Sequence, residues 1–221
     1  MTDSATQRTN MVESQIRPSD VTDRRILRAM QLIARERYVP SELAQLAYMD
    51  DQVPLNGTGG LATTRRLISP RTLAKLLQAA DIEEGDAVLD VGAGRGYGAA
   101  ILAQLARTVI ALECDQDLAA AARSALAAQP KVTVVTGQLP AGSTSHGPFN
   151  VIVLEGAVFE PPVGLLTQLA PGGRLVGVIQ DGAIGRAALW RNTGGHCGRK
   201  DLFEASVTAL PGFERKLSFV F

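Results

Sequence analysis

The stretch Ala87-Val-Leu-Asp-Val-Gly-Ala-Gly-Arg-Gly-Tyr-Gly98 decides the fold of this chain. Its apolar, β-branched start predicts a strand over 87–91, and the alanine- and leucine-rich run 99–106 that follows it predicts a helix. Glycine suits the loop between them because the backbone there must adopt positive φ, and because a Cβ would keep a ligand away from the main chain. The free N–H groups of the following helix favour an anionic ligand group. The stretch therefore predicts a unit that cradles a nucleotide-like ligand.

The spacing of the glycines distinguishes two classes of ligand. A dinucleotide fingerprint, G-x-G-x-x-G, starting at Gly92 requires glycine at position 97, which is Tyr97. With Asp90 the stretch instead reads D-x-G-x-G-x-G, which resembles motif I of the S-adenosylmethionine-dependent methyltransferases. Glu113 ends the next predicted strand, 108–113, where a carboxylate can bind both ribose hydroxyls. A nucleoside cofactor is the leading interpretation, and a purely structural turn is the alternative.

Composition limits the classes of partner. The chain has 221 residues, enough for one α/β domain, and its 22 basic residues balance 22 acidic ones. We therefore expect neither nucleic acid nor a membrane surface as partner. The N-terminus lacks the apolar core of a signal peptide and no apolar run is long enough to span a bilayer, which predicts a cytoplasmic protein of undetermined oligomeric state. Neither cysteine has metal-ligand spacing, so no metal site is predicted.

Beyond the glycine unit, predicted strands and helices alternate. Such alternation is typical of βαβ units, right-handed crossovers and a mostly parallel, doubly wound sheet. Ser69 and Pro70 predict the N-cap and first turn of one helix. The pattern predicts helices over 22–34, 70–80, 116–128 and 162–169, a shorter helix after Ser41, a long loop over 50–64, and strands over 132–135, 149–154 and 174–179.

The end of the chain predicts an antiparallel hairpin. Residues 202–210 and 213–221 have strand composition, and Pro211-Gly212 between them predicts a tight turn. Such a hairpin beside a parallel sheet is typical of class I methyltransferases. We expect residues 1–80 to form an N-terminal helical extension and substrate-side loop, part of the same domain as a cofactor-binding portion over 81–221.

Several ordered motifs together resemble the protein L-isoaspartate O-methyltransferase family. The resemblance implies a Rossmann-like class I methyltransferase with N-terminal helices. It also implies methyl transfer from S-adenosylmethionine to the α-carboxylate of isoaspartyl residues in damaged proteins, leaving S-adenosylhomocysteine. The methyl ester then collapses to a succinimide, so the reaction repairs protein. The motifs that carry the resemblance lie at 11–16, 29–30, 35–40, 88–97, 111–114, 149–157 and 169–176.

The resemblance also implies a set of cofactor-binding residues. One member departs from the family, which usually has Gly-Asp-Gly where this chain has Thr136-Gly-Gln-Leu139. Gln138 can still accept a hydrogen bond from the adenine amino group, without charge. The implied cofactor-binding residues are Asp90, Gly92, Ala93, Gly94, Gly96, Glu113, Cys114, Gln138 and Leu139.

The substrate side departs further from the family. Where the family usually has Thr-Ile-Ser-Gln-Pro, this chain has Arg66-Leu-Ile-Ser-Pro70, which puts Ile68 under the family serine. A small loop adjustment would let Ser69 take the catalytic role, and plain N-capping is its other interpretation. Thr63 and Thr64 are further hydroxyl candidates on the substrate side, against simple loop polarity.

Glu155 is an additional carboxylate after the strand at 149–154. Ligands of parallel sheets bind at this edge, where a carboxylate would repel an isoaspartyl group but could serve an amine or hydroxyl acceptor. The other interpretation of Glu155 is a solvated loop residue. Two further hypotheses therefore stay open: a methyltransferase with another protein or small-molecule acceptor, and a protein that binds the cofactor without isoaspartyl activity. A nicotinamide-dependent oxidoreductase ranks last because of Tyr97.

Overall fold

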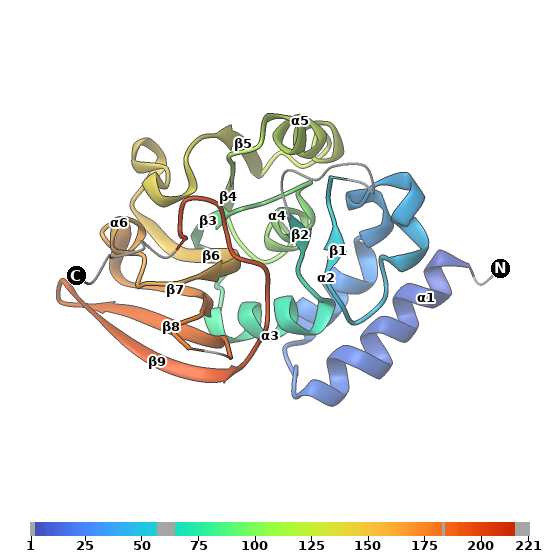
Figure 1. The fold of residues 1–221 in the computed structure, drawn as a ribbon, viewed down its shortest axis with the longest axis horizontal. Helices are drawn as coiled ribbons and strands as arrows, with labels where there is room; N and C mark the ends of the chain where they lie inside the picture. Colours follow the sequence, from blue (N-terminus) through green and yellow to red (C-terminus); the bar gives the residue numbers. More distant parts are fainter. Residues whose placement is uncertain (1–2, 57–64, 183, 215–221) are drawn as a thin grey trace, which may run out of the picture.

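The N-terminal part of the protein is helical. The computed structural model describes residues 3–56, 65–182 and 184–214. Asp23 caps α2 by accepting a hydrogen bond from the Arg25 backbone N–H, which confirms the amphipathic helix predicted there. These segments start, at the N-terminus, at the end of the molecule opposite the hairpin of β8 (Arg186–Thr193) and β9 (His196–Glu204) (Figure 1). They are α1 (Ser4–Met11), η1 (Val12–Ile16), η2 (Arg17–Ser19), α2 (Arg24–Leu32), η3 (Arg35–Tyr38) and η4 (Ser41–Leu46).

The described residues form a seven-stranded sheet with the order β5-β4-β3-β6-β7-β8-β9. Neighbouring strands from β5 to β7 pair in parallel, whereas β8 and β9 are antiparallel, which confirms the predicted fold class. The strands are β3 (Ala87–Val91), β4 (Thr108–Glu113), β5 (Val132–Thr136), β6 (Phe149–Val158), β7 (Leu169–Ile179), β8 (Arg186–Thr193) and β9 (His196–Glu204).

Hydrophobic residues cover both faces of the sheet. In β3, Val88 belongs to one buried cluster while Leu89 and Val91 belong to another, because successive side chains of a strand point to opposite faces. Such a sheet needs helices on both sides, as the predicted alternation requires. The remaining helical elements are α3 (Pro70–Ala80), α4 (Tyr97–Leu102), α5 (Gln116–Ala125), η5 (Leu139–Ala141), η6 (Thr144–His146) and α6 (Val163–Leu166).

The predicted loop over 50–64 contains a short strand. β1 (Val53–Pro54) pairs in antiparallel fashion with β2 (Arg66–Leu67), and the Leu55 N–H donates to the Arg65 carbonyl. Thr63 and Thr64, the hydroxyl candidates, lie outside the described residues. None of the helices within the described ranges has the length and apolar character needed to cross a bilayer.

The C-terminal hairpin was predicted at the wrong place. The strands are β8 and β9, joined at Gly194 and Gly195, whose φ values are 61° and 88°. Two consecutive residues with positive φ form the tight turn that matches the twist of a hairpin, so this glycine pair sets the register. Residues 205–208 are not a strand, and 215–221 lie outside the described residues. The segment after β9, red in Figure 1, runs past β6 instead.

Candidate functional site

The glycine loop has the backbone that its sequence requires. Gly92, Gly94 and Gly96 have φ values of 79°, 56° and 94°, a region that side chains with a Cβ rarely adopt. The loop follows β3 directly and leads into α4, as predicted. Ala93 lies within it and is buried. The loop therefore has the geometry of a ligand cradle at the carboxyl edge of the sheet.

Glu113 is brought to this loop by the parallel pairing of β3 and β4. Its carboxylate is 0% exposed, and its Oε2 accepts the Gly94 N–H at 2.7 Å. Its Oε1 accepts the backbone N–H groups of Cys114 at 2.8 Å and Asp115 at 3.1 Å. Arg65 completes the set with an Nη2 to Oε2 distance of 2.8 Å. Arg65 was not predicted from the sequence, because no local pattern shows which distant cation meets a buried acid.

Three side chains cover the outer face of the loop. Arg65 Nη2 also donates to the Gly92 carbonyl at 2.8 Å. A Cβ built on Gly92 would lie 2.6 Å from Leu210 Cδ2 and 3.1 Å from Arg65 Nη2. A Cβ built on Gly94 would lie 2.6 Å from Leu55 Cδ1. The absence of a Cβ at Gly92 and Gly94 thus allows other groups to approach the backbone closely. In this structure the side chains of Arg65, Leu210 and Leu55 do so.

Asp90 and Glu155 form a buried pair of carboxyl groups. Among the described residues, both oxygens of Asp90 and the Oε1 of Glu155 are buried without a hydrogen-bond partner outside the pair itself. Burial, together with the charge of Glu113, raises the pKa of Asp90 to about 7. Burial and the charge of Asp90 raise the pKa of Glu155 well above its usual range. Glu155 lies within β6 and is 3% exposed, so its interpretation as a solvated loop residue is wrong.

The charges of the buried groups balance if one proton is shared. Arg35 and Arg65 contribute two cations, while Asp90, Glu113 and Glu155 contribute three carboxyl groups, all of them buried. Net charge in an interior is costly, so one proton on the Asp90 and Glu155 pair leaves the cluster neutral. The raised pKa values of both groups agree with this protonation state.

Arg35 connects the N-terminal helices to the site. It is 0% exposed, its Nε donates to the Ala47 carbonyl at 2.7 Å and its Nη2 donates to the Ile68 carbonyl at 2.6 Å. Its guanidinium carbon lies 4.8 Å from the centre of the Tyr97 ring, a cation–π contact. Burial raises the pKa of Tyr97 to about 12, so the ring stays neutral.

The other candidate residues have different surroundings. Ser69 accepts the Thr72 N–H at 3.4 Å and donates to Thr72 Oγ1 at 2.9 Å, which confirms the predicted N-cap. Gln138 is exposed just after β5, and the neighbouring Leu139 is buried. Burial and the charge of Glu113 raise the pKa of Cys114 to about 11, so this thiol is not a ready nucleophile.

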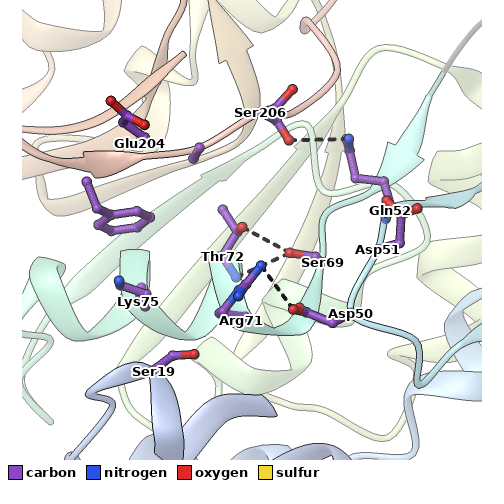
Figure 2. A pocket seen from close by; sticks show the side chains of 12 residues that line it. Ser19, Asp50, Asp51, Gln52, Ser69, Arg71, Thr72, Lys75, Glu204 and Ser206 are labelled. Atoms are coloured by element: carbon purple, nitrogen blue, oxygen red, sulfur yellow. Dashed lines mark hydrogen bonds and ion pairs between the residues drawn. The ribbon is translucent and has the colours of Figure 1, made fainter. Parts of the chain in front are cut away.

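Ser69 also lines a polar pocket of about 430 Å³ (Figure 2). Arg71 lies beside it with an Nη2 to Asp50 Oδ2 distance of 3.1 Å, and its side chain is 53% exposed. Lys75, one turn along α3, has its Nζ 4.3 Å from the centre of the Phe203 ring. The wall opposite α3 is formed by the end of β9 and the segment that follows it. The lining thus contains two cations, Arg71 and Lys75, and three carboxylates, Asp50, Asp51 and Glu204, around a pocket of a size suited to a peptide side chain.

Comparison with known proteins identifies similar chains. The family model described as protein-L-isoaspartate(D-aspartate) O-methyltransferase matches residues 6–202. The protein-L-isoaspartate O-methyltransferase of Koribacter versatilis is 33% identical over 214 residues, covering 96% of this chain and 94% of its own. The enzyme of the same description from Methylorubrum populi is 39% identical over 194 residues, covering 87% of each chain.

Two solved structures share the fold. One, described as a protein-L-isoaspartate O-methyltransferase, has a TM-score of 0.79 at 21% identity and covers 95% of this chain and 66% of its own. The other, a protein of the same kind from Plasmodium falciparum in complex with S-adenosyl-L-homocysteine, has a TM-score of 0.76 at 17% identity. It covers 95% of this chain and 99% of its own.

Proposed function

Because this chain belongs to the protein-L-isoaspartate(D-aspartate) O-methyltransferase family, we propose that it methylates the carboxylate of isoaspartyl residues in damaged proteins. The reaction uses S-adenosylmethionine and leaves S-adenosylhomocysteine. The observation that carries the proposal is the buried Glu113 carboxylate, hydrogen-bonded to a loop whose three glycines all have positive φ. This is the arrangement expected of a nucleoside cofactor site.

The residues at the loop fit this cofactor chemically. Glu113 can accept ribose hydroxyls once Arg65 leaves it, and Gly92, Ala93, Gly94 and Gly96 provide a backbone that tolerates close approach. The unpartnered oxygens of Asp90 suit a cationic group of the ligand. Cys114, Gln138 and Leu139, at the carboxyl ends of β4 and β5, would line the adenosine side. When bound, S-adenosylmethionine supplies an electrophilic methyl group.

The acceptor needs little chemical activation. An isoaspartyl carboxylate is ionised near pH 7, so the protein has to desolvate it and hold it in line with the methyl donor. Glu155 opposes this role less than an exposed carboxylate would, because burial and the charge of Asp90 raise its pKa and so favour its uncharged form. We propose that the acceptor approaches at the pocket beside Ser69, where Arg71 and Lys75 can contact its carboxylate and where Asp50, Asp51 and Glu204 also lie.

The test is methyl transfer to a defined acceptor. The protein is incubated with S-adenosylmethionine carrying a radiolabelled methyl group, and with an isoaspartyl peptide or the matching aspartyl peptide. Transfer to the isoaspartyl peptide alone, as a base-labile ester, supports the proposal. Binding of S-adenosylhomocysteine without transfer would exclude the isoaspartyl acceptor and favour the amine or hydroxyl acceptors that Glu155 could serve. Loss of transfer in Ser69→Ala with an unchanged melting temperature would assign Ser69 a role beyond its N-cap.

Replacing Arg71 with alanine is expected to weaken acceptor binding. Its guanidinium is half exposed and pairs only with Asp50 among the described residues, so stability should change little. Loss of one charged contact to the acceptor should raise KM for the isoaspartyl peptide about tenfold and leave kcat nearly unchanged. Arg123→Ala, on the exposed side of α5, is the control and should alter neither constant. An unchanged KM in Arg71→Ala would remove the pocket from the acceptor path.

A further inference from the structure

The face of the glycine loop that a ligand would contact is occupied from within the chain. Arg65 is 4% exposed and donates from one nitrogen, Nη2, to both Glu113 Oε2 and the Gly92 carbonyl, each at 2.8 Å. Arg65 is the residue just before β2, and its backbone carbonyl accepts the Leu55 N–H next to the pairing of β1 and β2. The Arg65 guanidinium therefore binds Glu113, the residue that we propose binds the ribose of the cofactor.

The contacts of Glu113 leave no room for a ribose hydroxyl while Arg65 is bound to it. A carboxylate has about four acceptor positions, and the Glu113 oxygens already accept from three backbone N–H groups besides Arg65. The backbone donors belong to the loop and to the end of β4, so they cannot leave without remodelling the sheet edge. Arg65 at Oε2 and the weak Cys114 thiol, 3.4 Å from Oε1, are the donors that a side-chain rotation can remove, and Arg65 is the charged one. A ribose can use Glu113 fully only after that rotation.

Leu210 is a second cover on the same loop. Leu210 is 0% exposed. A Cβ built on Gly92 would lie 2.6 Å from the Leu210 Cδ2, and a Cβ built on Gly156 would lie 2.8 Å from the same atom. Its backbone N–H donates to the Ala157 carbonyl at 2.8 Å, so the segment after β9 is held against β6. This contact is made by sequence-distant residues, independently of the ion pair of Arg65.

We propose that Arg65 is an internal competitor of the cofactor: its guanidinium closes the glycine cradle on Glu113, with Leu210 beside it, until an S-adenosyl ligand displaces both. The inference rests on the proposed function and concerns the regulation of the same site. When Arg65 is displaced from Glu113, Asp90 and Glu155 still provide negative charge near it, because both already interact electrostatically with Arg65. Arg65 can therefore adopt two discrete arrangements, one paired with Glu113 and one near the other two acids.

The test measures binding rather than activity. S-adenosylhomocysteine is titrated by calorimetry into the unaltered protein and into Arg65→Met, which keeps the apolar stem and removes the guanidinium. We expect the variant to bind about tenfold more tightly, because it no longer has to open the cradle. In stopped-flow experiments the observed binding rate of the unaltered protein should level off at high ligand concentration, where opening limits it. The rate of Arg65→Met should rise linearly.

Arg174→Met is the matched control. Arg174 and Asp86 form another buried ion pair with a distance of 2.8 Å, away from the glycine loop. This variant should lose stability as Arg65→Met does, with unchanged affinity for S-adenosylhomocysteine. Leu210→Ala is the second test variant, and it keeps the proposal testable if Arg65→Met does not fold; it should also bind more tightly.

The outcomes separate this inference from the proposed function. Equal affinities in the unaltered protein and both cradle variants overturn the competition and leave the cofactor assignment standing. Weaker binding by Arg65→Met overturns it too, because Arg65 would then help to bind the ligand. Absence of binding in every protein would refute the cofactor assignment together with the inference.

Discussion

Arg35→Met is expected to lower the free energy of unfolding by about 3 kcal/mol. The substitution keeps an apolar stem in the interior but removes the donors to the Ala47 and Ile68 carbonyls. The two hydrogen bonds connect η3 to the residue after η4 and to the segment that leads into α3. Their loss therefore loosens the contact between the N-terminal helices and the site. It also removes a buried cation whose charge acts on Glu155. Urea denaturation at pH 7 measures the effect.

Arg37→Met provides the control for this substitution. Arg37 belongs to the same η3 turn, yet it is exposed. Its replacement should change the free energy of unfolding by less than about 0.5 kcal/mol, as surface substitutions usually do. If Arg35→Met were no less stable than Arg37→Met, Arg35 would not join the two parts of the structure.

Glu155→Gln is expected to remove a large pH dependence of stability. In the unaltered protein, burial and the charge of Asp90 raise the pKa of Glu155 in the folded state well above its ordinary value of 4.5. Between the ordinary and the raised pKa the folded chain keeps a proton that the unfolded chain releases, so this contribution to stability is present at low pH and falls as pH rises. With glutamine at 155, two cations face two carboxylates, and no shared proton is required.

Denaturation at several pH values measures this difference. From pH 5 to pH 8, the free energy of unfolding of the unaltered protein should fall relative to Glu155→Gln by about 2–4 kcal/mol. Glu160→Gln, an exposed site just beyond β6, is the control and should follow the unaltered protein. Parallel pH profiles for Glu155→Gln and the unaltered protein would contradict the shared proton.

Local sequence patterns predicted much of the fold correctly. The bounds of β3 and β4 agree with the prediction because each is a short apolar run with clear breaks at both ends. The Ser69 cap and Pro70 start α3 as predicted. The C-terminal hairpin was misplaced because 202–210 has strand composition but pairs as a strand only up to Glu204. A register is set by the turn and the partner strand, which composition does not show.

The candidate site was only partly predictable. Parallel strands bring their carboxyl ends to one edge, so Glu113 and the glycine loop had to meet, and they do. Arg65 and Leu210 come from segments 27 and 118 positions away from Gly92, and no local pattern links them to it. The comparisons confirm the family, while the roles of individual site residues stay predictions.

The sequence by itself determined the strand, the glycine loop, the helix and the acid at the end of the next strand, because each follows from local backbone preference and side-chain periodicity. The tertiary structure alone decided the state of the charges. The pKa values of Asp90 and Glu155 are raised, and Arg65 pairs with Glu113, because burial and neighbours from distant segments set the cost of each ion. Those costs exist only once the chain has folded and water has left the edge of the sheet.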